Sequence, residues 1–294
     1  FPLNDINDRL NLGFNAVPWG DDWWINFGLV PASDYEAATA ASSKDEKSCH
    51  CPQVKSIQDE RKEIVWKRFD RQQMQLERLL AQKTGRFFME QASRLKRAAK
   101  ANALVTFDWE KEDKALEKML LPVLSEGVRE GISAAREQLQ KSAKAETEEN
   151  AERRYLGKVA QRILDINRTT RRKVETVLNQ GLQDGQSNEE MAHALADKVF
   201  GGFKTRARLI ARTESTGALN GGTAEYGAEL NATKTWLTAR DSEVRESHAA
   251  LDGETVGANE TFSNGLSYPG DPDAFAEADE VCNCRCTILL GVKK

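Results

Sequence analysis

Apolar residues recur at helical spacing through three long, otherwise charged stretches of the chain. The first runs from Ile57 to about Leu104, the second from Trp109 to Leu139, and the third from Tyr155 to Leu178. Because residues three and four apart share one face of an α-helix, each stretch predicts a long amphipathic helix. We expect these helices to form an antiparallel bundle or hairpin, with the second one kinked or restarted at Pro122.

A different pattern begins after the third stretch. Ser187 and Glu190 form a capping box that predicts a helix start, and Gly201 and Gly202 are expected to end that helix. Residues 204–230 predict one more helix, which carries several basic residues and glycines.

The chain changes character again beyond Asn231. Residues 233–239 ("TKTWLTA") predict a strand, 241–251 a short helix with Asp241 at its N-cap, and 282–292 ("CNCRCTILLGV") a closing strand. The loop of about thirty residues before the closing strand is either functional or held in place, for example by a metal. The predicted fold class is α+β, mostly α, with long helices followed by a small C-terminal domain containing a few strands.

We therefore divide the chain into an extended arm (1–36), a linker (37–56), a long-helix region (57–186) and a C-terminal domain (187–294). The arm is too short to form a core of its own, so its aromatic residues must be covered by another surface. That surface is either the rest of the same domain or a different structure. Residues 57–294 should then stay soluble and cooperatively folded when expressed alone. Since residue 1 is Phe, we expect a processed chain or the C-terminal piece of a longer one. The aromatic residues of the arm are Trp19, Trp23, Trp24 and Phe27.

Charge is unevenly distributed along the chain. The formal net charge of -4 argues against neutralisation of nucleic acid by the whole surface. Residues 241–280 are strongly acidic, whereas residues 153–173 form a basic stretch. The basic stretch could contact DNA, or it could be an ordinary solvated helix face, since no aromatic stacking platform accompanies it. Its members are Arg153, Arg154, Lys158, Arg162, Arg168, Arg171, Arg172 and Lys173.

Three of the five cysteines lie within five residues, at Cys282, Cys284 and Cys286. In a strand these thiols would share one face, where His248 on a facing helix could join them around a zinc ion. Two alternatives stay open: buried reduced thiols, and a disulfide between two of the three. With four protein ligands the site would be closed and structural. With water in one position, a zinc-dependent hydrolase or nuclease becomes conceivable.

No stretch of the sequence is apolar enough to span a bilayer, and the start lacks the pattern of a signal peptide. We therefore expect no membrane partner, and a protein assembled in the cytoplasm.

Several motifs in order resemble the Mu F-like minor head protein family of tailed bacteriophages. They are "IARTESTGALN", then "KTWLTARDSEVRESHAALDGETV", and finally "NCRC", within residues 187–294. The family usually has an apolar residue where Cys282 stands. The matching motif residues are Arg212, Glu214, Trp236, Asp241, Arg245, His248, Asp252, Gly253 and Asn283 to Cys286.

A shorter resemblance concerns the first residues. The segment "LNDINDRLNLGFNAVPWGDDWWINFGLVP" resembles the C-terminal tail of a phage portal protein, with Asp5 where that pattern usually has Asn. Taken with the first resemblance, it favours packing of the arm on a different structure and suggests a portal protein fused to a Mu F-like domain.

The two resemblances imply a virion component, not an enzyme. It would lie inside the capsid near the portal vertex, with the portal protein, capsid or scaffold proteins and packaged DNA as partners, and act in head assembly and genome packaging or delivery. A DNA-binding adaptor at the portal vertex is the further alternative.

Mu F-like domains also precede toxin modules in longer proteins, and no such module is recognised here. We expect Asp241, Arg212 and Arg245 to be structural, with the arginines pairing with carboxylates such as Glu214 or Asp252.

Overall fold

The computed structural model describes residues 24–25, 30–31, 57–140, 145–271 and 278–292. The chain divides into two units, Phe1–Val54 and Lys55–Lys294. In the first unit, strand β1 (Trp24–Ile25) pairs antiparallel with β2 (Val30–Pro31). The remainder of the predicted arm, the linker, and Cys49 and Cys51 lie outside the described residues.

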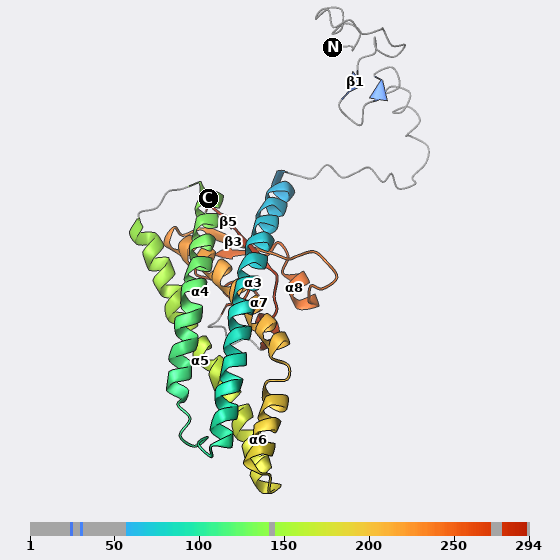
Figure 1. Cartoon of the computed structure of the whole chain (residues 1–294). Helices are drawn as coiled ribbons and strands as arrows, with labels where there is room; N and C mark the ends of the chain where they lie inside the picture. The colour runs from blue at the N-terminus through green and yellow to red at the C-terminus, as the bar shows by residue number, and fades with distance from the viewer. Residues whose placement is uncertain (1–23, 26–29, 32–56, 141–144, 272–277, 293–294) are drawn as a thin grey trace, which may run out of the picture. The chain divides into compact units, whose positions relative to one another are not determined.

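Three long helices dominate the second unit, as the hydrophobic periodicity predicted. They are α3 (Ile57–Lys100), α4 (Trp109–Leu139) and α5 (Ala145–Gln183) (Figure 1). Asp108 caps α4 by accepting a 2.9 Å hydrogen bond from the backbone N–H of Lys111. Helix α4 continues through Pro122, so the predicted restart at this proline does not occur.

A fourth helix, α7 (Phe203–Glu229), forms the centre of the unit and packs against α3, α4 and α5. Every residue from Thr213 to Gly227 is buried, although most of them are small or polar. Small side chains allow neighbouring backbones to approach closely: a Cβ atom on Gly222 would overlap the carbonyl oxygen of Val128 in α4. The predicted helix thus exists, and its glycines are contact points.

The connection into α7 follows the predicted signals. Helix α6 (Asn188–Ala194) begins with the capping box of Ser187 and Glu190, in which each side chain accepts from the other residue's backbone N–H. It continues as a short π-helical segment, η1 (Leu195–Val199), and the turn at Gly201 and Gly202 then leads into α7.

A three-stranded antiparallel sheet completes the unit, in the order β4-β3-β5. Its strands are β3 (Thr233–Leu237), β4 (Thr255–Gly257) and β5 (Thr287–Gly291). Because Trp236 pairs with Ile288 and Lys234 with Leu290, these four buried side chains share one face. Leu290 on this face lies next to Gly227 of α7. The α+β, mostly helical fold class is therefore confirmed.

The long segment before β5 is more ordered than a loop prediction implies. It contains β4 and the four-residue helix α9 (Ala278–Val281), although residues 272–277 lie outside the described part of the chain. Phe262, Leu266 and Tyr268 are buried, and the Asn220 side chain donates a 3.0 Å hydrogen bond to the carbonyl of Pro269. Apolar anchors and a hydrogen bond from α7 therefore help to hold this segment in place.

No helix in the described ranges combines the length and the apolar character that a membrane crossing requires.

Candidate metal centre

Helix α8 (Glu246–Ala250) is a single helical turn that follows β3, and it carries the candidate ligand His248. Its ring lies edge-on to the Trp236 indole, with ring centroids 5.2 Å apart. Trp236 in turn contacts Phe262 edge-on, with centroids 5.0 Å apart. Helix α8 begins after Arg245, so the prediction that Asp241 caps it is wrong. Asp241 instead accepts a hydrogen bond from the backbone N–H of Glu243 and pairs with Arg285 at 2.8 Å.

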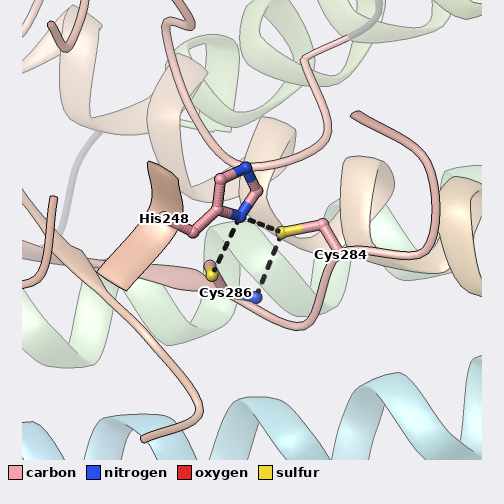
Figure 2. Close-up of side chains that lie close together, drawn as sticks. All are labelled: His248, Cys284 and Cys286. Carbon is pink, nitrogen blue, oxygen red and sulfur yellow. Dashed lines mark hydrogen bonds between the residues drawn. The ribbon is translucent and has the colours of Figure 1, made fainter. Parts of the chain in front are cut away.

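The three cysteines do not belong to a strand, which corrects the predicted closing strand at residues 282–292. Strand β5 begins only at Thr287, and Asn283 has a φ of 60°, a left-handed conformation outside the β region. The thiols of Cys284 and Cys286 nevertheless point toward the same place (Figure 2). Cys282 is partly exposed and does not join them.

One face of α7 holds the cysteine segment in this irregular conformation. The Thr213 hydroxyl accepts from the backbone N–H of Asn283 at 3.1 Å. One turn on, the Thr216 hydroxyl donates to the carbonyl of Cys284 at 2.7 Å, and the Asn220 amide donates to the carbonyl of Cys286 at 2.9 Å. Because side chains of α7 form hydrogen bonds with these backbone groups, the segment does not need to pair with another strand. Sequence reasoning missed this role, although positions 213, 216 and 220 share one helix face.

His248, Cys284 and Cys286 form a compact buried cluster. The Nδ1 atom of His248 lies 3.5 Å from the Sγ atom of Cys284 and 3.5 Å from that of Cys286 (Figure 2). The backbone N–H of Cys286 also donates to Cys284 Sγ, at 3.3 Å. The ligand atoms of all three residues lie within 4.8 Å of one another, and the residues are 1%, 2% and 2% exposed. Thiolate and imidazole at these distances can bind a metal ion.

The opposite edge of the His248 ring faces Glu280, a residue that sequence reasoning missed. Its Oε2 atom lies 3.2 Å from Nε2 of His248, at ion-pair distance. Ser247 Oγ donates to Glu280 at 2.8 Å, and the Asn264 amide donates at 3.3 Å. These contacts fix a carboxylate beside the ring. Only the tertiary fold could reveal it, because Glu280 is one of many acidic residues in its part of the sequence.

The cluster changes the protonation of its members. Burial, the largest influence, lowers the pKa of His248, but the Cys284 sulfur and Glu280 outweigh it and raise the pKa above its ordinary value. The pKa of Cys284 is lowered, chiefly by a hydrogen bond from Cys286 and also by His248, while that of Cys286 is raised by the same bond and by burial. These shifts favour the thiolate form at Cys284 over Cys286.

The remaining motif residues connect elements around the cluster. Arg212 pairs with Glu77 of α3 at 3.0 Å, and Glu214 pairs with Arg162 of α5 at 2.7 Å. Arg212 thus pairs with a carboxylate, as expected, but its partner is Glu77 and not Glu214 or Asp252. Arg245 donates to the carbonyl of Cys282.

The Asp-Gly pair after α8 forms a turn. Asp252 accepts from the backbone N–H of Thr238 at 2.9 Å and pairs with Arg240 at 3.1 Å. Gly253 has a φ of +92°, which favours glycine, and its N–H donates to the carbonyl of Trp236 at 2.9 Å. The turn therefore returns the chain from α8 to β4.

The basic residues of α5 divide into two groups. Arg154 and Lys158 both pair with Glu225 of α7, and Arg162 pairs with Glu214. Arg154 is nevertheless exposed, as are the other five: Arg153, Arg168, Arg171, Arg172 and Lys173. Within this group, Arg168 pairs with Asp165 and Arg171 with Glu175, both on α5 itself. The predicted DNA contact of α5 stays a prediction.

Comparison with known proteins gives similarities that cover part of the chain. Over 116 residues the chain is 36% identical to the NAD(+)–arginine ADP-ribosyltransferase EFV of Enterococcus faecalis, covering 37% of this chain and 23% of that protein. Over 133 residues it is 31% identical to the minor head protein GP7 of Bacillus phage SPP1, covering 42% of this chain and 43% of that protein. The chain thus spans less than half the length of either relative. No solved structure matches the chain.

The matched family region contains the whole candidate metal centre. Residues 172–289 match the family described as Phage Mu protein F like protein, from the end of α5 into β5. The resemblance to this family is therefore confirmed, while the portal-like interpretation of the first residues stays a prediction. Residues 172–289 of the chain are thus similar to the phage Mu protein F-like family.

Proposed function

We propose that the chain is a structural minor head protein of a tailed phage. It acts in head assembly and in genome packaging or delivery, inside the capsid near the portal vertex. One observation carries this proposal: residues 172–289 match the Mu F-like family, and the chain is 31% identical to a protein named as a minor head protein. The portal protein is the proposed partner, because the first residues resemble the tail of such a protein.

The buried cluster favours a role without catalysis. His248, Cys284 and Cys286 are at most 2% exposed, so a substrate could not reach an ion bound between them in this conformation. An enzyme with a catalytic metal keeps an open coordination position that its substrate can approach. The similarity to the ADP-ribosyltransferase covers only 23% of that enzyme, so its activity is not transferred to this chain.

Packaged DNA is a second proposed partner. The exposed basic residues of α5 end in the consecutive Arg171, Arg172 and Lys173, which form a short basic surface. Each phosphate that such residues neutralise releases counterions, so the contact would weaken with salt. Charge alone supports this contact, since it involves no sequence readout.

The test is deletion of the gene from the phage that encodes the chain, with complementation in trans. We expect deletion to lower the yield of DNA-filled heads, and the wild-type gene to restore it. Replacing Arg171, Arg172 and Lys173 with Gln should restore heads that contain less DNA. The matched replacement of Lys111, Lys114 and Lys118, exposed lysines of α4, should restore normal heads. Electron microscopy and the DNA content of purified particles provide the readouts.

Two outcomes would contradict the proposal, one for each of its parts. Normal heads in the absence of the gene would exclude a role in assembly or packaging. An equal DNA content after the α5 and α4 replacements would exclude the DNA contact while leaving the structural role intact.

A further inference from the structure

We propose that His248 Nδ1, Cys284 Sγ and Cys286 Sγ bind one zinc ion, which stabilises the C-terminal part of the protein. This inference goes beyond the proposed role in the phage head and does not depend on it. Three residues separated by 36 and 38 positions in the sequence converge on one point, and all are buried. The ion would join α8 to the segment that leads into β5.

The interatomic distances agree with those between ligands of one tetrahedral ion. Zinc lies about 2.3 Å from a thiolate sulfur and about 2.0 to 2.1 Å from an imidazole nitrogen. At the tetrahedral angle, these bond lengths place the sulfur and the nitrogen about 3.5 to 3.6 Å apart. Both observed distances between Nδ1 and sulfur are 3.5 Å. The three side chains therefore need little movement to bind the ion.

Hydrogen bonding alone explains the arrangement less well. An imidazole nitrogen has one in-plane site, either an N–H donor or a lone pair, so Nδ1 can serve one sulfur with good geometry. Here two sulfur atoms lie at the same distance from it. A single ion between the three atoms satisfies all of them at once. The cysteines are also free, so no disulfide occupies the thiols.

The surroundings resemble the outer shell of a metal site. Glu280 lies 3.2 Å from Nε2, on the edge of the ring opposite the thiols. Metal-binding histidines commonly have a carboxylate at their second nitrogen, which orients the ring and makes the first nitrogen more basic. The backbone N–H of Cys286 donates to Cys284 Sγ, which supports a thiolate there. Glu280 is thus a positioning residue for the proposed ligand.

The ligand chemistry selects zinc, and the structure provides three protein ligands. Thiolates combined with imidazole suit zinc, whereas oxygen ligands suit magnesium or calcium. Among the residues that the structure describes, Cys282 does not lie with the cluster. We therefore assign it no ligand role, in contrast to the prediction from sequence, and propose a site with three protein ligands.

The experiment uses the whole chain, purified without chelator and without metal-affinity resin. Elemental analysis should find one zinc per chain in the wild type and in Cys282→Ser, and none in Cys284→Ser or Cys286→Ser. A strong chelator should lower the melting temperature of the wild type and of Cys282→Ser to that of the two ligand variants. Cys282→Ser is the matched control, because it removes a neighbouring thiol that the structure places outside the cluster.

Cobalt binding to the stripped wild type gives a readout that remains if the ligand variants fail to fold. Tetrahedral cobalt with two thiolates should produce sulfur-to-cobalt charge-transfer absorption that Cys282→Ser leaves unchanged. A fall of one third in this band would indicate three thiolates and overturn the three-ligand assignment. Wild-type protein that stays metal-free with added zinc, or that contains iron or copper instead, would overturn the zinc site.

Discussion

The ion pair between Arg162 and Glu214 places two charges inside the protein. Their side chains are 17% and 7% exposed, and the guanidinium lies 2.7 Å from the carboxylate. Arg162 also donates to the carbonyl of Gly270, so it connects α5 and α7 with the segment before β5. Removing one partner of a buried pair leaves an uncompensated charge, which costs more than the pair itself contributes.

We predict that Arg162→Met lowers the free energy of unfolding by about 3 to 5 kcal/mol, because Glu214 stays buried without its partner. The double variant Arg162→Met with Glu214→Gln should recover part of this loss. Arg168→Met is the control: it removes an exposed pair with Asp165 and should change stability by less than about 1 kcal/mol. Urea denaturation measures all three. A loss at Arg162 no larger than at Arg168 would show that the buried pair does not stabilise the fold.

Close backbone contact determines how the helices pack. A Cβ atom on Gly131 of α4 would overlap the carbonyl oxygen of Leu219 in α7, and one on Gly222 would overlap that of Val128. The overlapping atoms belong to the backbone, so they cannot turn aside as a flexible side chain can. The two helices are therefore close only because glycine occupies both positions.

The matched test compares two glycines in long helices. Gly131→Ala should lower stability by about 1 to 3 kcal/mol, because added volume at a closed contact pushes the backbones apart. Gly157→Ala in α5 should raise stability by about 0.4 to 1 kcal/mol, since a Cβ there meets nothing within 4 Å and alanine favours the helix. Thermal unfolding gives both values. Equal effects of the two substitutions would mean that α4 and α7 are not in backbone contact.

The elements that sequence predicted best are those that depend on local pattern alone. The three long helices have a regular apolar stripe, and Ser187 with Glu190 forms a capping box that needs no distant partner. The cysteine segment was assigned wrongly because its conformation depends on α7. The alternation of cysteines with polar residues predicted a strand. The side chains of Thr216 and Asn220 instead donate hydrogen bonds to the carbonyl groups of Cys284 and Cys286, and β5 begins only at Thr287.

The ligands of the proposed zinc site show that residue type and geometry are separate requirements. His248, Cys284 and Cys286 were predicted because their chemistry suits zinc, and the fold brings them together. Cys282 has the same chemistry but lies in a turn outside the cluster. Glu280 was missed because only the path of the chain through α9 carries it to the His248 ring. Residue type thus indicated candidates, and tertiary contacts decided among them.

At the scale of the whole molecule, the unit Lys55–Lys294 has one continuous hydrophobic core. The core runs from the long helices through α7 to the sheet, where Trp236, Ile288 and Leu290 are at most 1% exposed. The family match begins at residue 172, inside α5, yet α3 and α4 pack against α7 and cover it. The Mu F-like region therefore shares its core with the helices that precede it.

This shared core leads to a prediction about truncation. A fragment of residues 57–294 should unfold in one cooperative transition, at a temperature close to that of the same unit in the full chain, because the core lies within it. A fragment of residues 57–286 is the matched control. It lacks β5, so β3 loses its central pairing and the buried Ile288 and Leu290 are missing. We expect it to show no cooperative transition. Calorimetry of both fragments and the full chain checks this, and a 57–294 fragment that aggregates or melts without a transition would show that the first 56 residues are part of the folding unit.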